Sequence, residues 1–191
     1  QNLFSVATIF KEKNYQPYFI YGGDGYFDNM NNFFGGQGFD IVDRNRGNPL
    51  SDDIKTQRFN IPDNEVSFEN AWGICDEDLY KQSIKYADKS SKINKPFFQF
   101  VMTTSNHKPY TFPAGKIDLP QGDRNGAVKY TDYALGKFLA DAKTKPWFTP
   151  LNPYHGLKEN IARRPSHFQK GIICLVLFMW FKVKETMIRN V

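Results

Sequence analysis

The apolar positions near the start of the chain follow a helical period. In residues 2–14 they recur at spacings of three and four, at Leu3, Val6, Ala7 and Phe10. The lysines of this segment lie toward its end, where the helix dipole favours cations. Residues 16–23, "QPYFIYGG", form a short apolar run that stops at a glycine pair. This pattern predicts an amphipathic helix followed by a buried strand.

Later patterns predict two longer helices and a second strand. The polar stretch 24–44 predicts a loop and a short helix, and residues 97–102, "FFQFVM", predict the strand. A helix is expected from Asp76, a candidate N-cap, with an apolar face of Leu79, Ile84 and Ala87. Residues 125–144 carry the clearest helical pattern. Its apolar side consists of Val128, Tyr130 or Thr131, Ala134, Leu135, Phe138 and Leu139.

The alternation of helices and strands predicts an α/β fold with a largely parallel sheet flanked by helices. A chain of 191 residues is most simply one domain with one sizeable core. In such folds, function gathers in loops beyond the carboxyl ends of the strands. We therefore expect residues 22–40 and 103–113 to line one crevice.

The charge of the chain is concentrated in its tail. Of 25 Lys and Arg and 20 Asp and Glu, residues 149–191 carry seven basic and two acidic side chains, which leaves 18 of each sign before them. Because the body of the protein is neutral, its net charge of +5 does not predict a nucleic-acid partner. Cys75 and Cys174 form no CxxC pair and are interpreted as free thiols.

The two ends of the sequence have unusual features. The chain begins at Gln1 without an initiator Met, which we interpret as a cut that could have removed a targeting segment. The apolar run at residues 172–181, "IICLVLFMWF", is ten residues long, about half of the roughly 20 that a membrane helix needs. A buried strand or a short core helix is favoured, and use of this run for association is the alternative.

Three kinds of residue in the two loops are candidates for chemistry. Asp24, Asp28 and Asn29 carry oxygens suited to a hard cation, but their spacing does not match a calcium loop, so turn and capping roles are favoured. The "GGQG" at 35–38 lacks the ending of a phosphate-binding loop and is interpreted as a set of tight turns. His107, which follows the second strand, can act as a base, a phosphate donor or a metal ligand. Ser105 beside it does not by itself predict a catalytic triad.

Several segments in order resemble one family. "FIYGGDGYFDNMNNFFGGQGFD", "AWGICDEDLY", "FFQFVMTTSNHKPYTFP" and "YTDYALGKFL" are similar to the sulfatase-like domain of the lipoteichoic acid synthase (phosphoglycerol transferase) type, in the alkaline phosphatase superfamily. The resemblance covers residues 1–148, as the central part of the catalytic domain, and implies an alkaline-phosphatase-like α/β sandwich. It also implies transfer or hydrolysis of phosphate or sulfate esters by a Thr nucleophile and a divalent cation, manganese above all.

The resemblance assigns a role to His107 and places the protein outside the cytoplasm. His107 corresponds to the histidine that contacts the substrate phosphate. The family implies a domain on the extracytoplasmic side of the cell membrane, with an ester substrate such as a phosphatidylglycerol-like lipid head group and membrane anchoring through segments outside this chain. Residues 27–30 read "FDNM" where these synthases have "FWNR", so Asp28 and Met30 supply neither the aromatic wall nor the cation. This leaves the head group, and the choice of phosphate or sulfate, open.

The catalytic residues of the family are not matched in this sequence. The nucleophile and an acidic metal ligand are expected upstream of Gln1, and an Asp-His metal pair is expected near residues 149–165, where the sequence has none. His155 and His167 lack acidic neighbours and are not taken as metal ligands. We interpret residues 149–191 as a divergent basic and apolar tail, with a frameshift as one hypothesis. The expected function is a fragment of the enzyme that is inactive alone; the alternative is a non-catalytic anion-binding or vestigial domain.

Overall fold

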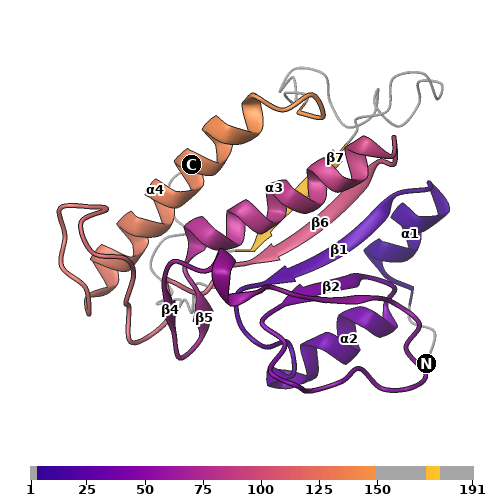
Figure 1. The fold of residues 1–191 in the computed structure, drawn as a ribbon, viewed down its shortest axis with the longest axis horizontal. Coiled ribbons are helices and arrows are strands. Elements are labelled where there is room, and N and C mark those ends of the chain that lie inside the picture. Colours follow the sequence, from indigo (N-terminus) through magenta and orange to yellow (C-terminus); the bar gives the residue numbers. More distant parts are fainter. Residues whose placement is uncertain (1–3, 149–170, 177–191) are drawn as a thin grey trace, which may run out of the picture.

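A five-stranded parallel sheet forms the middle layer of the molecule (Figure 1). The computed structural model describes residues 4–148 and the backbone of residues 171–176. The helices are α1 (Val6–Glu12), α2 (Met30–Gly36), α3 (Asp76–Lys92) and α4 (Arg124–Lys143), with short 3-10 helices η1 (Phe27–Asn29) and η2 (Asp63–Glu65). The strands are β1 (Gln16–Tyr21), β2 (Asp40–Asp43), β3 (Arg58–Asn60), β4 (Glu69–Asn70), β5 (Gly73–Ile74), β6 (Phe97–Met102) and β7 (Gly171–Val176).

The order of strands in the sheet is β3-β2-β1-β6-β7, and β4 and β5 form a separate antiparallel hairpin. Strands β1 and β6 pair over their whole lengths, from Gln16 beside Phe97 to Tyr21 beside Met102. The two apolar runs recognised in the sequence are thus adjacent, parallel strands at the centre of the sheet. The expected α/β class with a parallel sheet flanked by helices is confirmed.

Each face of the sheet has its own hydrophobic core. On one face, Tyr18 and Ile20 of β1 and Val101 of β6 pack with buried side chains of α3 and α4. On the other face, Phe19 of β1 and Phe98 of β6 pack with residues of α1 and α2. Successive strand residues point to opposite faces, so a strand buried on both sides is apolar throughout. This is why "YFIY" and "FFQFVM" contain almost no polar positions.

The first helix is shorter than expected. Residues 2–14 were predicted to be helical, but α1 begins at Val6, after an N-cap at Ser5. The Ser5 side chain accepts a hydrogen bond from the backbone N–H of Thr8, and the Thr8 side chain accepts one from the backbone N–H of Ser5, which forms a capping box. At the other end, Asn14 adopts a positive φ of 62°, which ends the helix before β1.

Two predictions about the long helices were wrong in detail. Asp76 was expected to be the N-cap of α3, but Cys75 occupies that position and Asp76 is the first helical residue. On α4, Val128 is 41% exposed and Leu139 is 40% exposed. The buried side is instead formed by Ala127, Tyr130, Thr131, Ala134, Phe138 and Ala142. Tyr130, Ala134 and Phe138 of the expected side are therefore buried, and Val128 and Leu139 are the members of that side that are exposed.

The sheet contains strands that the sequence pattern does not predict. Residues 24–44 were expected to form a loop and a short helix, and η1 and α2 confirm this for the first part of the stretch. Residues 40–43, however, form β2, which pairs with β1. Residues 58–60 form β3, which pairs with β2. Strands of four and three residues are too short to show an alternating pattern.

The apolar run near the end of the chain also joins the sheet. Residues 171–176 form β7, parallel to β6, which agrees with the strand interpretation of this run. Residues 177–181 of the same run lie outside the described residues. In the part of the chain that the structure describes, no helix is both long enough and apolar enough to cross a bilayer.

Candidate functional site

The two loops expected to form a crevice leave the sheet side by side. Tyr21 and Met102 are the last paired residues of β1 and β6, so Gly22 and Thr103 emerge at the same edge. The hairpin of β4 and β5 joins them as a third segment. The backbone N–H of Ile74 donates to the carbonyl of Gly22 at 2.9 Å, and the Thr104 hydroxyl donates to the carbonyl of Ile74 at 2.8 Å. Three segments distant in sequence therefore meet at the carboxyl end of β1.

This meeting of three backbones requires glycine at two positions. A Cβ atom on Gly23 would lie 2.3 Å from the carbonyl oxygen of Trp72. A Cβ atom on Gly73 would lie 2.2 Å from the carbonyl oxygen of Gly22, and Gly73 has a φ of 140° that side chains disfavour. The glycine pair after β1 and the Gly in "WGICDED" are thus explained by direct backbone contact.

A buried carboxylate holds the loop after β6 in place. One oxygen of Asp76 accepts hydrogen bonds from the backbone N–H groups of Ser105 at 3.0 Å and Thr104 at 3.3 Å. The other oxygen accepts from the hydroxyl of Thr131 on α4 at 2.9 Å. The Asp76 backbone N–H in turn donates to the Ser105 hydroxyl at 3.1 Å. Asp76 therefore connects the loop to both α3 and α4.

The pKa of Asp76 is raised from its ordinary value of 3.8. Burial is the main cause, because the side chain is fully enclosed, and hydrogen bonds from Ser105, Thr131 and Thr104 oppose the rise. Ser105 is explained by this arrangement. Its hydroxyl accepts from the first residue of α3, and it serves as a structural partner of Asp76.

His107 lies at the end of this clamped loop. Its backbone N–H donates to the carbonyl of Thr104 at 3.1 Å, and its ring is half-buried. Nδ1 lies 3.0 Å from the carbonyl oxygen of Lys108. Since a carbonyl only accepts, we infer that Nδ1 carries the hydrogen of this bond.

An indole ring packs directly on His107. The ring centroids of Trp72 and His107 are 3.8 Å apart. The Trp72 indole N–H also donates to the carbonyl of Lys108, so the two rings share one acceptor. Sequence reasoning gave Trp72 no role of its own. The sequence feature that could have indicated Trp72 is the Trp-Gly pair just before the start of α3. In the structure, this pair places an aromatic side chain at the turn of the β4–β5 hairpin.

Asn106 has an unmatched donor beside His107. It is 6% exposed, and among the described residues no hydrogen-bond partner is found for its side-chain nitrogen. A buried amide donor normally has an acceptor, because leaving it without one is costly. This makes Asn106 a polar group of the site that sequence reasoning did not single out.

A buried ion network supports the loop after β1. Arg58 of β3 donates to both oxygens of Asp43, at 2.9 and 2.6 Å, and to one oxygen of Asp24 at 2.7 Å. Asp43 is fully buried and accepts from the backbone N–H of Gly25 at 2.6 Å. Burial raises the pKa of Asp43 despite its bonds to Arg58. Burial also acts to raise the pKa of Asp24, but hydrogen bonds led by that from Tyr26 leave it lowered.

The candidate cation ligands and the "GGQG" have structural roles in this loop. Asp24 belongs to the network of Arg58, while Asp28 and Asn29 have positive φ values of 50° and 56° in the turn that leads into α2. Gly35 and Gly36 belong to the last turn of α2, and Gly38 has a φ of 96° in the turn after it. Asn29 is the N-cap of α2 and Asp28 lies in the turn before it, in agreement with the favoured interpretation, whereas in the "GGQG" only Gln37 and Gly38 lie in a turn.

The described residues do not form a metal site. Among them, no group of three or more His, Cys, Asp or Glu side chains is arranged to hold an ion. The expected Asp-His position and His155 and His167 lie outside the described residues. The divalent cation implied by the resemblance therefore does not fit the described part of the chain.

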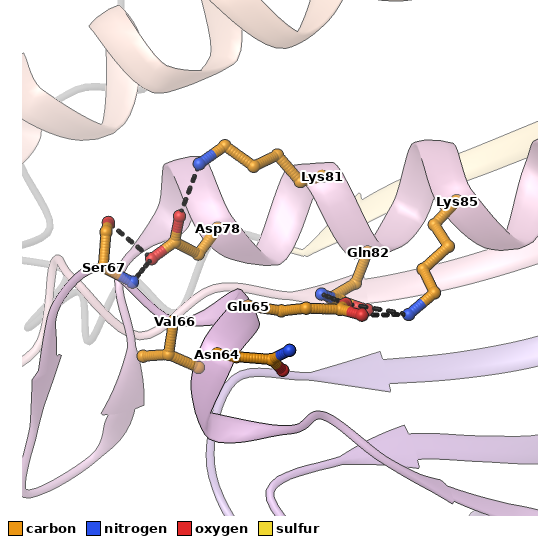
Figure 2. Close-up of a pocket in the computed structure, with 8 residues that line it drawn as sticks. All are labelled: Asn64, Glu65, Val66, Ser67, Asp78, Lys81, Gln82 and Lys85. Carbon is orange, nitrogen blue, oxygen red and sulfur yellow. Dashed lines mark hydrogen bonds and ion pairs between the residues drawn. The ribbon is translucent and has the colours of Figure 1, made fainter.

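A hollow of about 380 Å³ beside α3 contains many charged side chains but has little to offer a ligand (Figure 2). Glu65 accepts from Lys85 and Gln82, and Asp78 accepts from Lys81, as the dashed lines in Figure 2 show. The contacts of Glu65 link η2 to α3, while Asp78 and Lys81 pair within α3. The edge around His107 remains the candidate site.

Comparison with known proteins assigns the chain to a family. Residues 1–148 match the sulfatase family, and the chain belongs to it. The chain is 25% identical over 169 residues to lipoteichoic acid synthase 2 of Bacillus subtilis, a match that covers 82% of this chain and 23% of the synthase. It is also 25% identical over 150 residues to phosphoglycerol transferase I of Citrobacter koseri, covering 75% of this chain and 18% of the transferase. The chain thus spans about a fifth of the length of these relatives.

Two solved structures share the fold. A protein in the alkaline phosphatase superfamily from Vibrio parahaemolyticus is 42% identical, with a TM-score of 0.63, covering 76% of this chain and 33% of that protein. The lipoteichoic acid synthase LtaP from Listeria monocytogenes is 23% identical, with a TM-score of 0.58, covering 75% of this chain and 34% of the synthase. The expected resemblance to the lipoteichoic acid synthase type, within the alkaline phosphatase superfamily, is confirmed.

The role of Asp76 as a clamp predicts the effects of two substitutions. Asp76→Ala removes the acceptor of two loop amides and one hydroxyl, so we expect the free energy of unfolding to fall by about 2–4 kcal/mol. Asp76→Asn keeps an oxygen for the loop amides and an NH₂ group for Thr131, so its loss should be well below that of alanine. Denaturant unfolding of the two variants measures both values, and equal losses would contradict the clamp.

The pH dependence of the same pair gives an independent check. A carboxyl with a raised pKa in the folded state contributes stability that is fully present below its unfolded pKa, near 3.8, and is lost as the pH rises through its folded pKa. Asn does not titrate. We therefore expect the free energy of unfolding of Asp76→Asn to increase relative to that of the wild type as the pH rises from about 3 to about 7. A shift in favour of the wild type over this range would show that the pKa is lowered.

Proposed function

We propose that this chain forms the substrate-binding part of a sulfatase-family site for a phosphate or sulfate ester, with His107 as a donor to the anionic group. The observation that carries the proposal is the position of His107. It lies at the carboxyl end of a central parallel strand, on a loop clamped by Asp76 and against Trp72, in the segment that matches the family. Strand-end loops held in this way are where α/β proteins bind ligands.

The orientation of His107 indicates which nitrogen meets the ester. Because Nδ1–H is used on the carbonyl of Lys108, a hydrogen bond to an ester oxygen would come from Nε2, which carries a hydrogen in the doubly protonated imidazole. A hydrogen bond from a charged imidazole to an anionic oxygen is stronger than one between neutral groups. The amide of Asn106, buried in the same loop, is a second donor that an oxyanion would satisfy.

The wider setting follows from the family. We propose that the complete domain acts on the extracytoplasmic side of the cell membrane, anchored through other segments, on an ester such as a phosphatidylglycerol-like lipid head group. A divalent cation, manganese in this proposal, would supply the activation of a Thr hydroxyl in that complete domain. The part of the chain described here contributes binding and orientation of the ester, and residues 149–191 are proposed as a divergent basic and apolar tail, of which β7 pairs with the sheet.

One prediction of this proposal concerns anion binding by His107. Inorganic sulfate should bind the wild-type chain and raise its melting temperature, and His107→Ala should weaken the affinity at least about tenfold, since a charge-assisted hydrogen bond is lost. His107→Gln, whose amide NH₂ can reach the position of Nε2, should retain part of the affinity. Calorimetric titration with sulfate measures these values. Equal affinity of wild type and His107→Ala would remove His107 from the site.

A further prediction concerns catalysis by the 191-residue chain alone. With manganese added, we expect no hydrolysis of phosphodiester or sulfate-ester substrates above the level of His107→Ala, because binding and catalytic residues are proposed to be divided between this chain and other parts of the domain. Assays with chromogenic phosphodiester and sulfate esters measure the rates. Clear turnover that is lost in His107→Ala would show that the chain contains a working site.

A further inference from the structure

We propose that a hollow beside Trp72 binds the alcohol part of the ester, and that it selects an alcohol with a flat ring over the three-carbon chain of glycerol. The inference rests on the proposed function, in which His107 holds the anionic group of the same ester. The sequence left the alcohol part of the substrate open, and this inference gives its chemical class.

The hollow has a volume of about 550 Å³ and opens between the turn after β1 and the β4–β5 hairpin. Four of its lining residues are aromatic, namely the buried Tyr21 and the more accessible Tyr26, Phe27 and Trp72. Tyr26 is 60% exposed and Phe27 is 43% exposed. Large aromatic side chains held open in a concave surface are typical of ligand sites, where their faces become covered on binding.

The position of Trp72 connects the hollow to His107. Its ring centroid is 3.8 Å from that of His107 and 5.5 Å from that of Phe27. Phe27 meets the indole at 88°, so the two rings form a corner. Because Trp72 contacts both His107 and Phe27, an ester held at His107 lies beside a residue that lines the hollow. A flat ring can stack on one aromatic wall there and meet the other with its edge, which are the favoured aromatic geometries.

The polar groups of the hollow are already engaged. Asp24 accepts hydrogen bonds from Arg58 at 2.7 Å, from the Asn48 side chain at 2.9 Å and from the backbone of Tyr26 at 3.0 Å. Arg46 forms an ion pair with Glu69. A glycerol chain depends on hydrogen bonds to its hydroxyls, and it would have to compete with these contacts. A ring depends on apolar and aromatic contact, which the walls supply directly.

The charge at the hollow argues against another ligand of aromatic sites. Quaternary ammonium groups such as choline bind in aromatic cages through cation–π attraction. Here Asp24 and Arg46 both line the hollow, and each is already paired with a charge of opposite sign, so the hollow does not favour a cation. A neutral ring attached to a phosphate or sulfate is the class of ligand that the aromatic walls favour.

The test compares four ligands on the same chain: inorganic phosphate, glycerol 3-phosphate, phenyl phosphate and glucose 1-phosphate. The variants are Phe27→Ala and, as a matched control, Phe33→Ala, which removes another exposed phenylalanine that does not line this hollow. Calorimetric titration gives the affinities. We expect wild type to bind phenyl phosphate about five- to tenfold tighter than glycerol 3-phosphate, a range typical of one aromatic contact.

Phe27→Ala should remove most of this preference while leaving the affinity for inorganic phosphate within about twofold, and Phe33→Ala should change neither. Glucose 1-phosphate, whose ring is puckered and carries hydroxyls, should bind more weakly than phenyl phosphate, and tighter binding of glucose 1-phosphate would contradict a preference for a flat ring. Equal binding of glycerol and ring esters by wild type would overturn the proposal, as would an equal loss of inorganic phosphate binding in Phe27→Ala.

The same titrations separate this proposal from the proposed function. If wild type does not bind inorganic phosphate, the anion site at His107 fails. The hollow is then tested with phenol, a neutral ring, through quenching of Trp72 fluorescence, with Trp72→Phe identifying the signal. Quenching by phenol that is lost in Phe27→Ala supports the ring site by itself, and its absence in wild type overturns it.

Discussion

The candidate site depends on how one buried carboxylate is satisfied. Asp76 is fully buried, and a carboxyl in that position is tolerated only when its oxygens are matched by donors. Two of those donors are backbone N–H groups of the loop after β6, and a third comes from Thr131 of α4. The same contacts that satisfy Asp76 therefore fix the loop relative to two helices. These contacts of Asp76 also position His107, which lies three residues beyond Thr104.

The loop after β1 is also held by a buried carboxylate, that of Asp43. Arg58 is drawn from the edge of the sheet toward Asp43 and Asp24, and its bidentate contact with Asp43 fixes the orientation of the guanidinium. Asp43 also accepts from the backbone of Gly25, so the turn after β1 is tied to β2 and β3. One carboxylate thus holds each loop. The glycines at 22, 23 and 73 let the two loops and the hairpin approach closely between these anchors.

The sequence predicts best what depends on long apolar patterns. Strands β1 and β6 and helices α3 and α4 were recognised because burial on both faces of a strand, or on one face of a helix, repeats over many residues. Strands β2 and β3 are too short for this signal. The role of Asp76 was missed for a different reason: an Asp at the start of a helix has the same local pattern whether it caps the helix or binds a loop 28 residues away. Trp72 meets His107 only through tertiary structure, so its part in the site could not be predicted from spacing.

The origin of the aromatic wall shows why a motif comparison alone misjudges this site. At "FDNM", Asp28 and Met30 replace residues that the lipoteichoic acid synthase type uses for the substrate, and the sequence therefore suggests that the aromatic surface is lost. In the structure, Asp28 lies in a left-handed turn and Met30 packs with the core on the α1 and α2 face. Phe27 of the same motif instead meets Trp72, which comes from a hairpin 45 residues further along the chain. Aromatic surface is present at the site, but two segments supply it together. In the proposed ring site, substrate preference is a property of the corner that Phe27 and Trp72 form, and comparison of either motif by itself does not reveal that corner.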